Sequence, residues 1–207
     1  MTTFETTRHQ VAIAGQVSDF ETTRSIAGAL VRITAAPAEF LTRLAALAQQ
    51  YGADWATLRE RPDQTATAPD GHFHLLDLPN GQYTLTVSLP GSGTRYGTRQ
   101  GQVSVSRDAS DNIVLAAADL TLPPTVLKGQ VTREDGTPLA MAAVRIKGSG
   151  EQGFSDGQGR YVLAPLEIGQ RTIIASGQGF SPVTRVLQLA TAGTAVTANF
   201  TLAALAP

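Results

Sequence analysis

The stretch from Asp70 to Val87 reads DGHFHLLDLPNGQYTLTV, and the same pattern returns from Gln158 to Ala175 as QGRYVLAPLEIGQRTIIA. The two copies agree at glycine, aromatic and aliphatic positions. The matched pairs are Gly71 with Gly159, Phe73 with Tyr161, Leu75 with Leu163, Leu78 with Leu166, Gly81 with Gly169, and Leu85 with Ile173. Each copy has an alternating apolar run, a turn and a second alternating run, which predicts two strands joined by a tight connection. The chain is therefore a tandem repeat of one β-rich unit.

The strand pattern extends beyond this hairpin in both units. Residues 10–17 alternate apolar and polar side chains, and residues 26–34 are rich in side chains that favour strands. Both segments recur in the second unit, as Gly129-Gln130-Val131 and as residues 139–146. Many short strands at even spacing predict two antiparallel β-sandwiches.

Length and composition agree with two folded domains. The chain has 207 residues, of which 42% are hydrophobic and 16% charged, as is typical of globular proteins. The formal net charge of −1 gives no general attraction to nucleic acid. Cysteine is absent, which excludes disulfides and thiolate metal sites. The start, MTTFETTRHQ, has no secretory pattern, and no apolar run could span a bilayer, so we expect a cytoplasmic protein without membrane insertion.

We divide the chain into a flexible N-terminal segment (1–8), a first sandwich domain (9–122), a linker (123–124) and a second sandwich domain (125–207). The linker consists of two prolines, which favour a stiff and extended spacer. Each domain is large enough to bury one hydrophobic core.

One segment of the first domain, at about residues 38–61, has a helical pattern instead. Its apolar residues are spaced three or four positions apart, which predicts an amphipathic helix. These residues are Phe40, Leu44, Leu47, Tyr51, Trp55 and Leu58. Gly52 is suited to end a first helix, and Asp54 to cap a short second one. The second domain has nothing comparable, so this segment is an insertion.

The second domain carries, from Lys128 to Ser176, the order G-x-V, D-G-x-P-L-A-x-A-x-V-x-I, S-D-x-x-G-x-Y-x-L and L-x-x-G-x-x-x-I. This order resembles the carboxypeptidase regulatory-like domain, and residues 14–33 joined to 67–87 resemble it in the first domain. The resemblance implies a mainly β chain of two tandem seven-stranded, prealbumin-like Greek-key sandwiches, the first with a short α-helical insertion. This fold is a common carrier module, so function has to be argued from a site.

His72 and His74 lie two residues apart on a predicted strand, so their side chains face the same side. Two imidazoles are too few for a metal site, and the third histidine of the chain is His9. Intradiol dioxygenases have a related fold and bind iron through tyrosine and His-x-His ligands, but here Phe73 stands at the aromatic position after Asp-Gly. We therefore predict neither a metal nor another cofactor.

The segment Gly153 to Gly157, GFSDG, fits the G-x-S-x-G pattern of hydrolase nucleophiles around Ser155. That pattern requires a helix after the serine and a histidine later in the chain, and no histidine follows His74. The overlapping GSGEQG fits a phosphate-binding G-x-G-x-x-G, but it also lacks a following helix. We predict no catalytic residue and no enzymatic activity.

Lys128 and Asn199 stand near the places of the lysine and asparagine that form an isopeptide bond in the similar B-type repeats of collagen adhesins. That reaction needs a buried carboxylic acid beside the two groups. The acid would fall near Ala175, and the nearest one is Glu167, so we expect no cross-link.

The insertion is the part that departs from the family pattern. Its apolar stripe needs cover, either from its own domain or from a partner protein by helix-in-groove docking. We therefore take the six stripe residues, Phe40, Leu44, Leu47, Tyr51, Trp55 and Leu58, as candidate protein-interaction residues. The sequence predicts a non-catalytic structural or adaptor protein that binds other proteins in a multi-subunit assembly. By family analogy, a phage-tail-like contractile particle is one such assembly.

Two alternatives stay open. A carbohydrate-binding or surface-adhesion module needs a row of exposed aromatic side chains, for which the candidates are Phe73, Tyr83, Tyr96, Tyr161 and Phe180. A small hydrolase ranks last, because the sequence shows no complete catalytic constellation.

Overall fold

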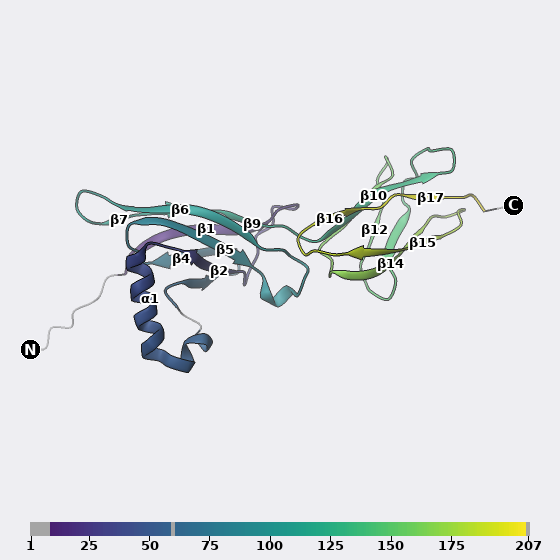
Figure 1. Ribbon diagram of the computed structural model, residues 1–207. Helices are drawn as coiled ribbons and strands as arrows, with labels where there is room; N and C mark the ends of the chain where they lie inside the picture. Colours follow the sequence, from purple (N-terminus) through teal and green to yellow (C-terminus); the bar gives the residue numbers. More distant parts are fainter. Residues whose placement is uncertain (1–8, 59–60, 206–207) are drawn as a thin grey trace, which may run out of the picture. The chain divides into compact units, whose positions relative to one another are not determined.

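A computed structural model of the chain describes residues 9–58 and 61–205, and the predicted flexible segment 1–8 lies outside them. The chain divides into two compact units, which we describe one at a time (Figure 1). Unit 1 comprises the described part of Met1–Gly91 together with Thr98–Leu122, and unit 2 comprises Ser92–Gly97 together with Pro123–Pro207. Residues 92–97 thus group with unit 2, although they lie within the range 9–122 predicted for the first domain.

Unit 1 contains two sheets. The first has β1 (Val11–Asp19) between β4 (His72–Leu76) on one side and β8 (Ala116–Ala117) and β9 (Leu120–Leu122) on the other. The second has the order β3 (Gln64–Ala66), β2 (Leu30–Ala35), β5 (Gly81–Ser88), β6 (Arg99–Arg107) and β7 (Ile113–Val114). Helix α1 (Ala38–Tyr51) and the 3₁₀ helix η1 (Gly52–Thr57) lie between β2 and β3 in the chain, and a 3₁₀ turn, η2 (Pro90–Ser92), follows β5.

Unit 2 repeats this arrangement. Its first sheet has β10 (Val126–Arg133) between β13 (Arg160–Leu163) on one side and β16 (Ala195–Thr197) and β17 (Phe200–Leu202) on the other. Its second sheet has the order β12 (Gln152–Phe154), β11 (Ala143–Ile146), β14 (Gly169–Ser176) and β15 (Val183–Leu189). The prediction of a mainly β fold with a helical insertion is confirmed, whereas the seven-strand Greek-key count stays a prediction.

The hairpin shared by the two units supplies core residues from alternate positions. In β4, Phe73 and Leu75 are buried, while His72 and His74 are exposed on the other face. In β13, Tyr161 and Leu163 are buried in the same way. Each of these side chains stabilises the fold by about 1.5–3 kcal/mol through removal of apolar surface from water. The strand period of two thus decides which side chains form the core.

A glycine in each central strand allows another chain segment to approach closely. A Cβ atom at Gly15 would lie 2.2 Å from the carbonyl oxygen of Ala118, and one at Gly129 would lie 1.8 Å from that of Ala198. Both distances are far below van der Waals contact, so a side chain at either position would push the backbone apart. The glycine of the G-x-V motif is therefore required by packing rather than by an unusual φ angle.

The residue after each of these glycines is held by a side chain from the neighbouring segment. The backbone N–H of Gln16 donates to Oδ1 of Asp119, and that of Gln130 donates to Oδ1 of Asn199, each at 2.9 Å. The amide side chains of both glutamines also donate to backbone carbonyls at the start of the hairpin. Asn199 therefore has the structural role in unit 2 that Asp119 has in unit 1.

Unit 2 also includes the short segment 92–97. The guanidinium of Arg95 forms ion pairs with Glu151 at 2.8 Å and with Glu167 at 3.3 Å. The hydroxyl of Thr94 donates to the same Glu167 carboxylate, and the backbone N–H of Gly97 donates to the carbonyl of Pro123 at 2.9 Å. These contacts join residues far apart in the sequence, which explains why the segment groups with unit 2.

A buried hydroxyl occupies the same place in each unit. Thr67 Oγ1 accepts a hydrogen bond from the backbone N–H of Ala29 at 2.9 Å and donates to the carbonyl of Ile26 at 2.6 Å. In unit 2, Ser155 Oγ accepts from the N–H of Ala142 at 2.9 Å and donates to the carbonyl of Leu139 at 2.6 Å. Ser155 is 2% exposed. The serine of the GFSDG motif thus holds together two backbone segments.

We expect the substitution Ser155→Ala to lower the free energy of unfolding of unit 2 by about 1–3 kcal/mol, because it leaves a buried N–H and a buried C=O without a partner. Ser155→Thr is the matched control, since it keeps the hydroxyl and has a counterpart in Thr67. Urea unfolding followed by circular dichroism measures both variants. Equal losses for alanine and threonine would contradict this role of the hydroxyl.

Candidate functional site

The insertion begins beside the sheets of unit 1 and runs away from them (Figure 1). Helix α1 starts after Pro37 and carries Glu39 in its first turn, where a negative charge is favourable. It ends at Gly52, whose φ of 54° is costly for other residues and whose N–H donates to the carbonyl of Ala48. The helix is therefore bounded by local signals, while most of its surface extends beyond the sandwich.

Burial of the predicted stripe decreases along α1. Phe40 is 1% exposed and packs edge-to-face against Tyr83, with ring centroids 5.9 Å apart. Leu44, Leu47, Trp55 and Leu58 are half-buried. Tyr51, in the last turn of α1, is 47% exposed. Leu41, which lies in the first turn and outside the predicted stripe, is 48% exposed. The first turn thus contributes Phe40 to the core of unit 1 but presents Leu41 to solvent, and the far end presents Tyr51.

The return of the chain from the insertion is held by a buried ion pair beside Trp55. The Arg61 guanidinium donates to both carboxylate oxygens of Asp63, at 2.8 and 2.6 Å. It also lies 4.4 Å from the centroid of the Trp55 ring, which in turn contacts Tyr51. Asp63 is 4% exposed. Trp55 therefore stabilises the insertion itself. Arg61 and Asp63 could not be predicted from the sequence, because only the fold brings them to the indole.

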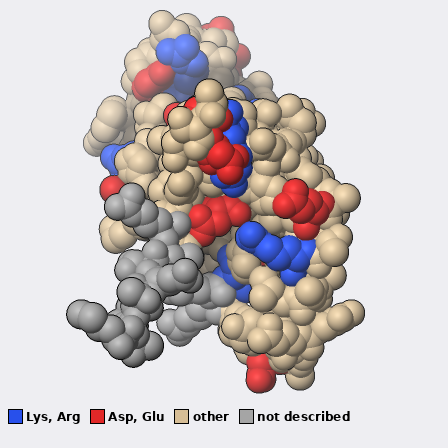
Figure 2. All heavy atoms as spheres, turned by 90° about the vertical axis from the view of Figure 1, so that its left-hand side faces the viewer, with Lys and Arg blue, Asp and Glu red and all other residues tan. Residues whose placement is uncertain are grey.

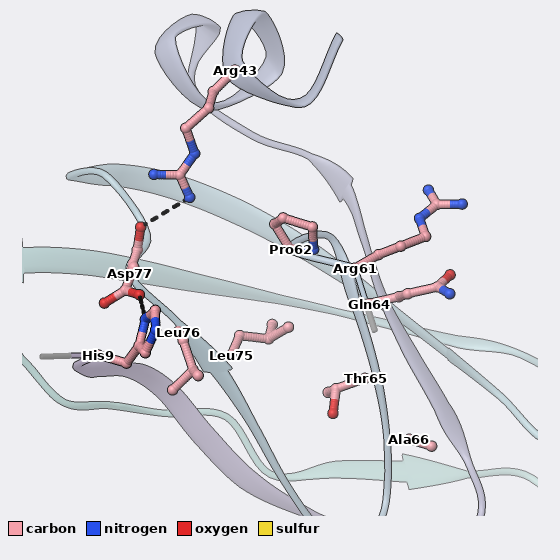
Figure 3. A pocket seen from close by; sticks show the side chains of 10 residues that line it. All are labelled: His9, Arg43, Arg61, Pro62, Gln64, Thr65, Ala66, Leu75, Leu76 and Asp77. Carbon is pink, nitrogen blue, oxygen red and sulfur yellow. Dashed lines mark hydrogen bonds and ion pairs between the residues drawn. The ribbon is translucent and has the colours of Figure 1, made fainter. Parts of the chain in front are cut away.

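A groove of about 600 Å³ lies between α1 and the edges of the two sheets (Figure 3). Leu75, Leu76 and Pro62 supply apolar surface within it, and Arg43 reaches toward it from α1. Of the six predicted interaction residues, none lines this groove. On the face shown in Figure 2, acidic and basic side chains are interspersed rather than sorted into a patch of one sign.

Asp77 connects three parts of unit 1 at one end of the groove. Its Oδ2 lies 2.5 Å from Nδ1 of His9, and its Oδ1 accepts from the backbone N–H of Gln10 at 2.8 Å. Its backbone carbonyl accepts from Arg43 at 3.3 Å. Partial burial raises the pKa of the Asp77 carboxyl, but the hydrogen bonds from Gln10 and His9 outweigh it, and the pKa lies below its ordinary value of 3.8.

The other candidate sites are distributed over the two units. His72 Nδ1 lies 3.2 Å from Asp70 on an exposed strand face, and within residues 9–58 and 61–205 no group of three or more His, Asp or Glu side chains is arranged to hold a metal ion. Lys128 is exposed on β10, and Asn199 already accepts the hydrogen bond from Gln130. In the described part of the chain, no helix is both long and apolar enough to cross a membrane.

The aromatic side chains considered for sugar stacking are largely inside the protein. Phe73, Tyr83 and Tyr161 are at most 3% exposed. Burial raises the pKa of the Tyr83 hydroxyl to about 12, and this hydroxyl donates to the carbonyl of Pro79. These three rings therefore offer no surface to a sugar.

The repeated sandwich and its sequence order identify the family. The carboxypeptidase regulatory-like domain matches residues 12–117 and again residues 126–203. The chain belongs to the carboxypeptidase regulatory-like domain family. The tandem resemblance predicted from the sequence is confirmed, and the insertion falls within the first of the two domains. A search of curated proteins finds no match.

Solved structures with a similar arrangement are distant in sequence. The shaft pilin SpaA from Lactobacillus rhamnosus GG is 10% identical, with 97% of this chain and 99% of that chain covered and a TM-score of 0.44. The streptococcal ancillary pilin is 15% identical, with 93% and 62% covered and a TM-score of 0.38. The Bacillus anthracis TIE protein is 14% identical with a TM-score of 0.36, and the match covers 94% of this chain but 34% of TIE.

Substitution of Asp63 by asparagine should loosen the insertion, because it leaves the Arg61 cation without its carboxylate in a nearly buried place. We expect a loss of about 3 kcal/mol in the free energy of unfolding of this region. Trp55 is the single tryptophan of the chain, so its fluorescence reports this region directly. A red shift in emission at temperatures where the circular dichroism of the sheets is unchanged is the expected result. Asp54→Asn, an exposed acid in η1, is the control, and an identical response from both variants would contradict the role of Asp63.

The lowered pKa of Asp77 makes unit 1 sensitive to acid. A carboxyl whose pKa is lower in the folded state stabilises the fold above its ordinary pKa and loses this contribution as the pH falls through the folded value. Because the Asp77 side chain is 35% exposed, the effect is no more than about 1 kcal/mol. Asp77→Asn, which also tolerates the φ of 53° at this position, should make unfolding of unit 1 less dependent on pH between 7 and 3, as followed by Trp55 fluorescence. An unchanged pH dependence would exclude the Asp77 contribution.

Proposed function

We propose that this chain is a non-catalytic structural or adaptor protein that binds other proteins within a larger assembly. The observation that carries this proposal is the insertion, whose first turn buries Phe40 in the core of unit 1 while Leu41 of that turn and Tyr51 at the far end are about half exposed. Exposed apolar surface on an ordered helix is typical of protein-binding surfaces.

The way in which the insertion is held supports a role beyond covering its own domain. Ordering a segment of this length costs roughly 1–2 kcal/mol of conformational entropy per residue. An insertion that only covered the sheet would offset this cost by burying its whole stripe, but within α1 Phe40 is the only side chain that is fully buried. The buried pair of Arg61 and Asp63 nevertheless fixes its return. A partner that covers Leu41 and Tyr51 would supply the missing contacts.

The described residues give less support to a hydrolase or to a carbohydrate-binding module. Ser155, the candidate nucleophile, is buried and uses its hydroxyl for two backbone hydrogen bonds. Phe73, Tyr83 and Tyr161 are buried, so a sugar cannot stack on them. The finer proposal that the assembly is a phage-tail-like contractile particle has its support in the family resemblance alone.

The full chain tests this function in affinity purification from native lysate. We compare the wild type, the double variant Leu41→Ser with Tyr51→Ser, and a control that changes two exposed apolar residues of unit 2, Phe154→Ser with Val186→Ser. We expect defined partners with the wild type and the control, and their loss with the insertion variant at unchanged thermal stability. Elution as a lone monomer, or equal recovery of partners with all three proteins, would refute the proposal. Specific micromolar binding to a glycan array would favour the carbohydrate alternative instead.

A further inference from the structure

The groove beside α1 lies between two edge strands. Within the described residues, β3 pairs with β2 on one side, and β4 pairs with β1 on one side. The two strands belong to different sheets, and residues of both line the groove, from Gln64 to Ala66 and from Leu75 to Asp77. An edge strand has backbone N–H and C=O groups on its outer side that can pair with another strand.

The backbone of β3 directs such groups outward. The carbonyl of Asp63 accepts from the N–H of Ile33 at 2.8 Å, and the N–H of Thr67 donates to the carbonyl of Ala29 at 2.9 Å, so these residues of the β3 segment face β2. Backbone direction alternates along an antiparallel pair. The N–H and C=O of Ala66 therefore face away from β2, on the side of the groove.

The same alternation holds for β4. The carbonyl of Gly71 accepts from the N–H of Val17 at 2.9 Å, so the odd-numbered residues of this strand face β1. The backbone groups of His74 and Leu76 therefore face away from β1. An extended chain placed in the groove would find backbone partners on both sides.

The side chains around the groove favour a ligand that carries an apolar group and a carboxylate. Leu76 and Pro62 are half-buried and give part of the groove an apolar lining. The two arginines of the groove differ in their ability to bind a further anion. Arg61 is already paired with Asp63. Arg43 donates one hydrogen bond to the carbonyl of Asp77 and forms no ion pair with the residues that the structure describes. The guanidinium of Arg43 therefore has donors left for a carboxylate.

Unit 2 has no insertion, so its strands β12 and β13 show the arrangement that corresponds to β3 and β4 without one. The corresponding hollow beside β12 and β13 has about 170 Å³ and is mainly polar. Glu151 lines it and is paired with Arg95. The sandwich without an insertion therefore has only a small hollow between these two strand edges. The wide apolar groove occurs in the unit that carries the insertion.

We propose that the groove of unit 1 binds an extended peptide segment of a partner protein. The segment pairs with the outer edge of β3 through Ala66, seats one apolar side chain on Leu76 and Pro62, and directs a carboxylate to Arg43. This inference rests on the proposed protein-binding function and assigns a second contact surface to it. Free backbone groups on two edge strands favour a peptide over a lipid or a small carboxylate, which have no strand to add.

The probe is a library of short random peptides displayed on phage, selected on the full chain and counter-selected on the Arg43→Glu variant. Enriched peptides are synthesised, and their affinities are measured by fluorescence anisotropy. We expect them to share alternating apolar positions and an acidic residue. Arg43→Glu should weaken their binding by about tenfold or more, since it replaces attraction of a carboxylate by repulsion.

Two further variants separate edge pairing from charge. Ala66→Pro removes the outward N–H of β3 but no hydrogen bond to β2, and it should also weaken binding by about tenfold. Arg145→Glu makes the same charge change on an exposed strand position of unit 2 and should leave the affinity unchanged. Circular dichroism and thermal unfolding confirm that each variant is folded.

The result that overturns this proposal is the absence of enriched peptides, or binding that is equal for the wild type, Arg43→Glu and Ala66→Pro. If the variant at Leu41 and Tyr51 loses its partners in the purification while the groove variants do not, the adaptor function stands and the groove proposal fails. If peptides bind the groove but no partner depends on Leu41 and Tyr51, the groove stands and the insertion surface fails.

Discussion

The central strands β1 and β10 each pair with other strands on both sides, and this pairing requires a very close backbone contact at one glycine. The carbonyls of Ala118 and Ala198 approach the backbones of Gly15 and Gly129 where no Cβ atom would fit. This close approach lets the last strands of each unit continue along the central strand in two short parallel pieces, with the antiparallel hairpin strand on the opposite side. The sandwich of both units depends on this geometry. A side chain at either glycine would separate strands that the whole core needs in register.

Several side chains that resemble reactive groups form hydrogen bonds to the backbone that hold each of the two sandwiches together. A polar group buried without a partner costs roughly 1–3 kcal/mol, so a buried hydroxyl or amide in a stable domain is bonded. Ser155 and Thr67 hold equivalent backbone segments, and Asn199 and Asp119 hold equivalent N–H groups. Motif matches at Ser155 and Asn199 therefore reflect the repeat, which uses chemically similar side chains for the same bonds in both units.

The connection between the second and third strands is the place where the two units differ. Unit 2 closes it with a short turn, whereas unit 1 inserts α1 and η1 there. Surface connections tolerate such insertions because loop closure costs little more as a loop grows. The insertion is held at its start by Phe40 in the core and at its end by the pair of Arg61 and Asp63. It changes a small polar hollow into a wide groove and adds an exposed helix end, so the specific properties of this protein are concentrated at that connection.

The sequence by itself determined the repeat, the strand-rich fold and the helical insertion, because these depend on local periodicity and on glycines at turns. The alternation of Phe73 and Leu75 with His72 and His74 was enough to separate core from surface, and the spacing of the apolar residues from Phe40 onward was enough to predict α1. The tertiary structure alone decided which distant residues meet. It brought His9 to Asp77, Arg61 to Trp55 and Arg95 to Glu167, and it placed Arg43 beside two strand edges. These contacts depend on strand register and on the course of the insertion, which no short window of sequence contains.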